Sequence, residues 1–262
     1  SSFTHDAEKL STEISNLYHF PKLMNLLPDF VDLKREESIY SPQHSRKISF
    51  TMNTMSTHSS FYSLVYEVVV YMYTSELCVT PDSFYMTLSN WTESYEYSQN
   101  NIKDIIKNKV PRYHSLEILP YDTVRVRGLI TKEYVSILMK ESDDTCTYLF
   151  MVNASDVFDF FQLSSLPDDI YFELTDSNGT RVLEYGISHQ SSEEGNTGKY
   201  YTFTAEIPTI NSNVTLRIPN SYFQAITREA HMQMGATMLL SLVVGCILAF
   251  VFSRIAAQPV QH

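Results

Sequence analysis

Hydrophobic positions follow a helical period at the start of the chain. In residues 1 to about 60, leucine, isoleucine and phenylalanine recur at three- and four-residue steps, as on one face of an α-helix. Pro21 and Pro28 punctuate this run, and Ser41-Pro42 precedes a second helical stretch that runs towards Phe61. An ordinary amphipathic helix on a domain and a stalk helix that rises from an earlier membrane span both fit this pattern.

From Ser63 the pattern becomes that of strands. LVYEVVVYMYT is rich in valine and tyrosine and predicts a strand buried on both faces, with LCVT as its return strand. Helix-like stretches follow at 83–89 and 100–109, and the section between the prolines at 111 and 120 reads as irregular. GLITKEYVSILMKE and TCTYLFMVN predict a strand pair joined by ESDD, after which Ser155 is expected to cap a short helix.

A second and smaller set of strands is predicted within 167–222. DIYFELTDSNGTRVLEY has the alternation of a hairpin, with Ile170, Phe172 and Leu174 on one face and Asn178-Gly179 as the tight turn. KYYTFTAEI and NSNVTLRIP predict two further strands, and a helix begins at NSYFQAITREAHMQ without a breaker before the next segment.

That next segment predicts a transmembrane helix. The stretch 232–253 contains 22 residues and no charge, and at 1.5 Å per residue it forms a helix about 33 Å long, enough to cross a bilayer core. A buried core helix and a tail anchor are the alternatives. The polar bulk of the chain precedes the span, and Arg254 follows it, as the positive-inside rule favours for the cytoplasmic side.

Composition and charge narrow the class of protein. The chain is 44% hydrophobic and 13% aromatic, which suffices for a buried core. Its net charge is −11, and because residues 235–262 hold one arginine and no carboxylate, the preceding part carries −12. An acidic region repels phosphate backbones, so we expect no nucleic-acid contact by this chain. Cys78 and Cys146 fit either a disulfide or two buried thiols, whereas Cys246 lies within the apolar segment.

The order of these segments resembles a known receptor arrangement. The similar parts are SLVYEVVVYMYTSELCVT, YVSILMKE, TYLFMVNASDVFDFF, IYFELTDSNGTRVL, VTLRIPNSYF and the exit SRIAAQPVQH. Together they resemble the extracellular double-CACHE sensor region of Firmicutes membrane receptors, found in YesM-like sensor histidine kinases and in membrane-bound AraC-class regulators.

The resemblance implies an α+β fold with one transmembrane helix. Residues 1–62 would form N-terminal stalk helices, 63–163 a membrane-distal PAS-like antiparallel-sheet unit, and 164–222 a membrane-proximal unit of the same kind. Residues 223–254 would form the exit helix and the membrane span, and 255–262 the start of a cytoplasmic HAMP-like linker.

One departure from the family concerns the ligand. In amino-acid-binding CACHE domains, an Arg-X-Trp-Tyr motif and a later Asp hold the ligand. Here Trp91 stands in SNWTES with no arginine two residues before it, so an amino-acid ligand is not carried over. Aromatic faces with an occasional arginine suit sugars, small acids or peptides. The candidate ligand-binding residues in the larger unit are Tyr71, Tyr73, Trp91, Tyr95, Arg125 and Arg127.

These residues also have a simpler interpretation, in which the tyrosines belong to the core and the arginines to a solvated strand face. The sequence contains no catalytic signature, and its eight histidines lack metal-ligand spacing. We therefore expect no enzyme, no cofactor and no metal in this fragment.

The leading hypothesis is a sensor in the bacterial cell membrane, with residues 1–231 outside and 255–262 in the cytoplasm. Its expected partners are an unknown small molecule or a solute-binding protein, the lipid bilayer and a second copy of the chain in a homodimer. A side-chain-filled cavity in the larger unit would favour the docked protein. An anchored adhesion or protein-docking ectodomain is the first rival, and a membrane-anchored enzyme is the second.

Overall fold

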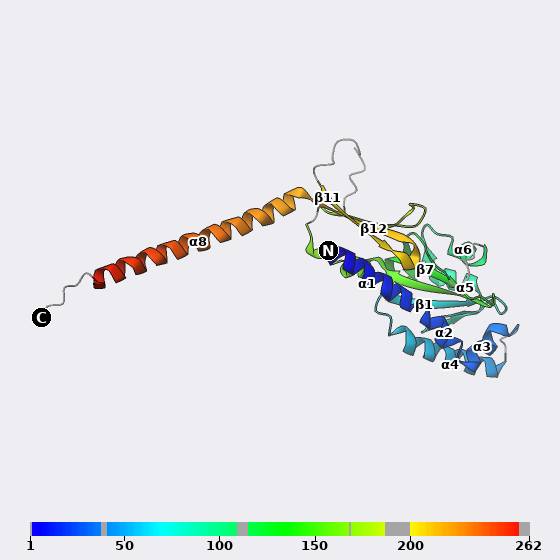
Figure 1. Cartoon of the computed structure of the whole chain (residues 1–262). Helices are drawn as coiled ribbons and strands as arrows, with labels where there is room; N and C mark the ends of the chain where they lie inside the picture. Colours follow the sequence, from blue (N-terminus) through cyan, green and yellow to red (C-terminus); the bar gives the residue numbers. More distant parts are fainter. Residues whose placement is uncertain (1, 38–40, 109–114, 168, 187–199, 257–262) are drawn as a thin grey trace. The chain divides into compact units, whose positions relative to one another are not determined.

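The computed structural model describes residues 2–37, 41–108, 115–167, 169–186 and 200–256 (Figure 1). Two compact units divide the chain: residues 1–188 with 202–217, and residues 189–201 with 218–262. The first unit contains most of both antiparallel sheets, and the second contains the C-terminal helix.

Four helices fill the N-terminal region: α1 (Ser2–Asn16), α2 (His19–Met24), α3 (Pro28–Arg35) and α4 (Pro42–Ser59). The predicted helical content is confirmed. Pro28 and Pro42 each occupy the first turn of a helix, where their missing N–H has no intrahelical partner to lose. The backbone N–H of Ser41 donates to His44 Nδ1 at 3.3 Å, which fixes the start of α4.

The larger sheet has eight strands, and every strand pairing in it is antiparallel. Its strand order is β3-β2-β1-β8-β7-β6-β4, with β5 paired to β7. The bounds are β1 (Val65–Met72), β2 (Cys78–Val79), β3 (Phe84–Tyr85), β4 (Tyr95–Tyr97), β5 (Leu116–Ile118), β6 (Asp122–Val126), β7 (Ile130–Lys140) and β8 (Cys146–Asn153).

Helices cover both faces of this sheet, which explains why β1 and β8 read as continuous apolar runs. On one face, Phe20 of α2 packs edge-on against Tyr148 and Phe150 of β8. On the opposite face, α5 (Leu88–Ser94) and α6 (Ile102–Asn108) bury Trp91 and Ile106 against the sheet. Figure 1 shows the N-terminal helices and the α5–α6 pair on opposite sides of β1 and β7.

The smaller sheet has the order β10-β9-β12-β11. Its strands are β9 (Tyr171–Thr175), β10 (Arg181–Gly186), β11 (Tyr200–Ile207) and β12 (Ser212–Pro219), with short helices α7 (Ala154–Phe160), η1 (Leu163–Ser165) and η2 (Pro208–Ile210) nearby in sequence. The predicted hairpin is confirmed, and Gly179 in its turn has φ +77°. Phe172 faces the core, where it meets Phe158 and Phe161.

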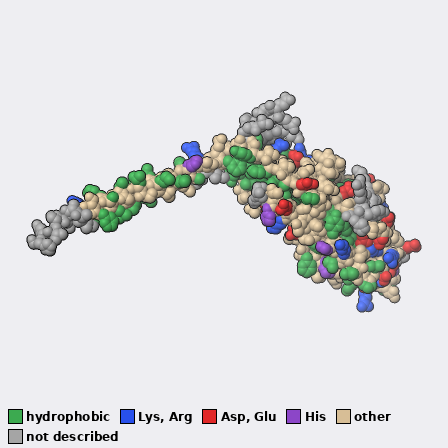
Figure 2. All heavy atoms as spheres, in the orientation of Figure 1, with side chains coloured by type: hydrophobic (Ala, Val, Ile, Leu, Met, Phe, Trp, Pro, Cys, Tyr) green, Lys and Arg blue, Asp and Glu red, His purple; other side chains and the backbone are tan. Residues whose placement is uncertain are grey.

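Helix α8 (Asn220–Ala256) starts directly after β12. Among the described residues it is the one helix with the length and hydropathy to cross a membrane, and its 18-residue apolar window is fully exposed in the protein alone. Figure 2 shows hydrophobic side chains along its surface. The structure thus contains the candidate membrane helix that the sequence predicted in this segment.

Several local predictions are wrong. Residues 84–85 form a strand, because they pair with Val79 and Cys78, and the helix begins only at Leu88 after Thr87 caps it. Asn153, not Ser155, occupies the N-cap of α7. Strand β5 and the start of β6 lie in or beside the section read as irregular, since pairing with β7 stabilises them.

The two domain cysteines are unpaired. Cys78 and Cys146 are both free and fully buried. Cys78 contributes to the core under α5 and α6, whereas strand alternation places Cys146 with Tyr148 on the other face of the sheet. The disulfide alternative is not realised in the structure.

Candidate functional site

The candidate ligand site lies under α5 and α6, on one face of the larger sheet. We call it the Glu67 cluster and define it as Glu67, Trp91, Tyr95, Tyr97, Tyr134 and Ser136. Alternation along β1 turns Glu67 to the same face as Val69 and Tyr71. Alternation along β7 does the same for Tyr134 and Ser136.

Local structure explains how the covering aromatic residues reach this face. The Thr87 side chain accepts a hydrogen bond from the backbone N–H of Asn90, and the short helix that it starts buries Trp91. The next residues form β4, which pairs with β6 at the edge of the sheet. This pairing places Tyr95 and Tyr97 on the same face of the sheet as Trp91. The Trp91 ring stacks on the Tyr95 ring with centroids 5.2 Å apart and an interplanar angle of 23°.

A buried carboxylate occupies this aromatic surrounding. Glu67 is 8% exposed, and the Tyr95 hydroxyl lies 2.8 and 2.6 Å from its two oxygens. Burial raises the pKa of Glu67, an effect that the Tyr95 hydrogen bond and the charge of Arg127 oppose. The Tyr97 hydroxyl is 3.2 Å from the Ser136 hydroxyl. The cluster thus has an acceptor at its centre and no buried cation beside it among the described residues.

Two buried polar atoms in the cluster lack hydrogen-bond partners within the described residues. They are the indole Nε1 of Trp91 and the hydroxyl of Tyr134, and both side chains are fully buried. Burial raises the pKa of Tyr134, and the neighbouring Tyr66 and then Glu67 raise it further. An unpaired buried donor lowers the stability of the fold by about 1–3 kcal/mol. A polar ligand group that accepted hydrogen bonds from these donors would remove that cost.

The structure brings four of the six predicted residues together. Trp91 and Tyr95 belong to the Glu67 cluster, and Tyr71 and Tyr73 lie beside it in the same core with ring centroids 5.0 Å apart. The Tyr73 hydroxyl is already engaged, at 3.2 Å from the Ile106 carbonyl and 2.7 Å from the Thr147 hydroxyl. Tyr71 and Tyr73 therefore fit the core interpretation at least as well.

The two arginines are exposed. Arg125 donates to the Gly128 carbonyl at 3.1 Å, and Arg127 donates to the Ser83 hydroxyl at 3.1 Å. Arg127 nevertheless acts electrostatically on Glu67 and Tyr95, so it lies at the rim of the cluster. Sequence reasoning missed Glu67, although a carboxylate inside the apolar run VYEVVVY is a readable signal.

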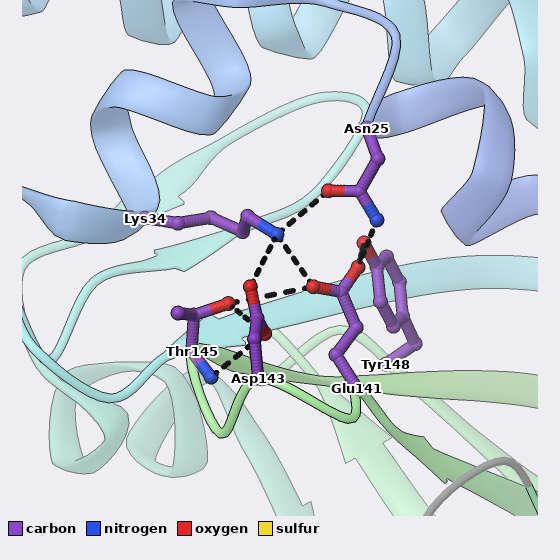
Figure 3. Close-up of polar contacts among 6 residues, drawn as sticks. All are labelled: Asn25, Lys34, Glu141, Asp143, Thr145 and Tyr148. Carbon is purple, nitrogen blue, oxygen red and sulfur yellow. Dashed lines mark hydrogen bonds and ion pairs between the residues drawn. The ribbon is translucent and has the colours of Figure 1, made fainter.

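A second polar cluster lies on the opposite face, and it is fully paired (Figure 3). We call it the Lys34 cluster: Asn25, Lys34, Glu141, Asp143, Thr145 and Tyr148. Lys34, 2% exposed on α3, donates to Glu141 at 2.5 Å and to Asn25 Oδ1 at 2.6 Å. Asn25 Nδ2 and the Tyr148 hydroxyl each donate to Glu141 Oε1 at 2.6 Å.

The remaining members close this network. Thr145 donates to Asp143 at 2.6 Å, and Lys34 lies 3.5 Å from the same carboxylate. Burial would raise the pKa of Asp143, but the Thr145 hydrogen bonds and the Lys34 charge lower it overall. The network ties α2 and α3 to the β7–β8 turn, and its satisfied groups leave no capacity for a ligand. We interpret it as a structural clamp.

A small cavity beside α1 is too small for a metabolite. Its volume is about 30 Å³, room for one or two water molecules, and its walls are mostly apolar, with Leu10, Ile14 and Val135 among them. Across the described residues, no group of three or more His, Cys, Asp or Glu side chains is placed to hold a metal ion.

No family model and no curated protein matches the chain. Solved structures do match its fold. The extracellular domain of the histidine kinase vpHK1S-Z8 has a TM-score of 0.51 at 10% identity, over 86% of this chain and 95% of that one. The corresponding domain of soHK1S-Z6 has a TM-score of 0.50 at 9% identity, over 85% and 92%. The fold is that of CACHE-like extracellular sensor domains.

A weaker likeness involves a protein with a known ligand. The ligand-binding domain of the Pseudomonas fluorescens chemoreceptor CtaA, solved in complex with L-isoleucine, has a TM-score of 0.48 at 11% identity, over 85% of this chain and 91% of that one. That likeness is too low to assign a ligand to the present chain.

Proposed function

We propose that this chain is the extracellular ligand-sensing region of a bacterial transmembrane signalling receptor. The CACHE-like sensor fold and the apolar helix α8 support this function. In the proposal, residues 1–231 lie outside the cell, α8 crosses the membrane, and 255–262 lead to a cytoplasmic histidine kinase or AraC-class DNA-binding output. Residues 63–163 form the membrane-distal unit and 164–222 the membrane-proximal unit of each subunit in a homodimer.

The ligand assignment depends on one observation: the Glu67 cluster contains a buried carboxylate without a buried cation, and two buried donors without partners among the described residues. A buried carboxylate is stable when a positive charge or hydrogen-bond donors accompany it. Here Tyr95 donates to Glu67, a hydrogen bond with the Thr80 side chain also opposes the rise that burial causes in the pKa of Glu67, and no buried cation accompanies the carboxylate among the described residues. The faces of Trp91 and Tyr95 attract cations. We therefore propose an organic amine as the ligand, with its ammonium group at Glu67.

Binding at this closed cluster requires α5, α6 and β4 to move, since Trp91, Tyr95 and Tyr134 are all buried. An amine that binds the opened arrangement more tightly shifts the population towards it. In the proposal, the conformational change reaches the membrane helix through the junction between β12 and α8, where Pro219 is followed directly by the first helical residue Asn220. A helix without a flexible linker transmits displacement of the sheet to the span.

Thermal unfolding of the full chain in lipid nanodiscs, with a panel of organic amines and matched carboxylic acids, tests this function. A ligand at 100 times its Kd should stabilise the folded state by about 2.7 kcal/mol. Glu67→Gln should abolish that stabilisation, whereas Glu117→Gln, at an exposed position on β5, should retain it. Stabilisation by acids only, or stabilisation that survives Glu67→Gln, would contradict the assignment.

The closed packing of the Glu67 cluster also favours a second candidate function. In this alternative, a solute-binding protein or another protein docks on the distal unit, and no small molecule enters it. The anchored protein-docking ectodomain without signalling belongs to the same class. Cross-linking of the intact receptor on cells, followed by mass spectrometry, distinguishes them: a stoichiometric protein partner together with a negative amine screen would favour docking.

A further inference from the structure

Beside the first turns of α8 lies an open hollow of about 580 Å³. Its lining includes Tyr201 on β11 and a set of residues on one side of the helix: Asn220, Phe223, Gln224, Thr227, Arg228, His231 and Met232. Their spacing of three and four residues places them on a single helical face. The Tyr201 and Phe223 rings meet edge to face at 4.9 Å and form one apolar wall.

The basic residues of this hollow stand at a defined height above the apolar segment. Arg228 precedes Met232, the first residue of the uncharged stretch, by four residues, or about 6 Å along the helix. The headgroup layer of a bilayer is about 5–7 Å thick on each side of the hydrocarbon core. If α8 spans the membrane as proposed, Arg228 and His231 therefore lie within the outer headgroup layer.

The basic side chains at this height contrast with the net negative charge of the chain. The part before residue 235 carries a net charge of −12, so an anionic membrane surface repels the domain as a whole. A guanidinium group matches a phosphate by paired hydrogen bonds, and Arg228 is exposed on the helix surface. His231 one turn further on and the Gln224 amide one turn before supply additional donors on the same face.

We propose that this hollow binds the phosphate headgroup of an anionic phospholipid in the outer leaflet, with Arg228 and His231 as the phosphate ligands and the Tyr201–Phe223 wall against the glycerol backbone. The proposal rests on the membrane-spanning role of α8 and adds a lipid site to it. A bound headgroup would hold the start of α8 at a fixed depth, where movement of the domain enters the membrane.

Native mass spectrometry of the full chain, released from nanodiscs that contain phosphatidylcholine with or without phosphatidylglycerol, tests this site. The wild-type chain should retain phosphatidylglycerol over phosphatidylcholine by about tenfold, given the usual contribution of basic residues near an anionic surface. Arg228→Gln combined with His231→Gln should remove the preference. Arg254→Gln, on the other flank of the span, should preserve it.

Three outcomes would overturn the proposal. Equal retention of both lipids by the wild-type chain contradicts a site for an anionic phospholipid but leaves the proposed membrane span intact. Displacement of the lipid by excess free glycerol phosphate shows that the hollow takes soluble phosphate, not a membrane lipid. Failure of the chain to insert into any nanodisc contradicts the lipid site and the proposed receptor together.

Discussion

The two faces of the larger sheet carry polar clusters of opposite character. The Lys34 cluster pairs a buried ammonium with a buried carboxylate and satisfies both through Asn25 and Tyr148. The Glu67 cluster buries a carboxylate without a buried cation and leaves two polar atoms unpaired within the described chain. A buried network whose polar groups all have hydrogen-bond partners stabilises one structure. A buried network with unpaired polar groups marks a place where a bound ligand can supply the missing partners and lower the free energy.

The largest expected effect lies in the Lys34 cluster. Lys34→Met leaves Glu141 buried without its counter-charge and should lower the free energy of unfolding by about 3–5 kcal/mol. Lys107→Met, which removes an exposed pair with Glu76, should cost at most about 1 kcal/mol. Urea unfolding of the full chain measures both. A loss below that of the control would show that the clamp does not stabilise the fold.

A matched pair of hydroxyl deletions gives the next effect. Tyr148→Phe removes a 2.6 Å hydrogen bond to Glu141 and should destabilise the chain by about 1.5–3 kcal/mol. Tyr134→Phe removes a buried hydroxyl without a partner in the described structure, so it should be neutral or stabilising. Equal losses in the same unfolding assay would mean that the two clusters do not differ as described.

Removal of the buried charge in the Glu67 cluster should change how stability depends on pH. Because burial raises the pKa of Glu67 above its ordinary value of 4.5, the folded state favours the protonated form. Its contribution to stability is therefore present below pH 4.5 and is lost as pH rises through the elevated folded pKa. Glu67→Gln should flatten this decline, which unfolding at pH 5 and pH 8 measures. A profile identical to the wild type would exclude this titration.

The smallest effect is expected at the rim. Arg127→Gln removes the positive charge that lowers the pKa of Glu67, so the decline in stability should begin from a higher folded pKa and shift to higher pH. Arg125→Gln is the control, since Arg125 is exposed, donates to the Gly128 carbonyl and is not among the main influences on the pKa of Glu67. The same pH series compares them, and equal shifts would contradict a specific link between Arg127 and Glu67.

The fold could be predicted where one local signal dominates. Period-2 alternation identified the β9–β10 hairpin, and the uncharged stretch identified the candidate membrane helix in α8. Short strands were missed because pairing with another strand stabilises them: Phe84 pairs with Val79 in a short hairpin, and Leu116 pairs with Met139, more than twenty residues further along the chain. No local pattern carries that information.

The candidate site could be predicted only in part. Aromatic residues of the larger unit indicated the face that carries the Glu67 cluster, since Trp91 and Tyr95 lie there together. The sequence did not identify Tyr134 or Ser136 as members, because their position depends on the register of β7 against β8. Arg125 and Arg127 were candidates for the same site, and the structure exposes both, Arg125 on β6 and Arg127 just after it, which fits the alternative of a solvated strand face.

The location of the cysteines has a practical consequence. Cys78 and Cys146 are inaccessible in the folded sheet, and burial raises the pKa of both thiols, which suppresses their reaction with electrophiles. Cys246 lies on α8 within the apolar segment proposed to span the membrane, where the hydrocarbon core shields it from aqueous reagents. A maleimide should therefore modify neither Cys78 nor Cys146 in the native chain and both after the sheet opens. Modification of these two cysteines thus reports unfolding of the larger sheet without an introduced label.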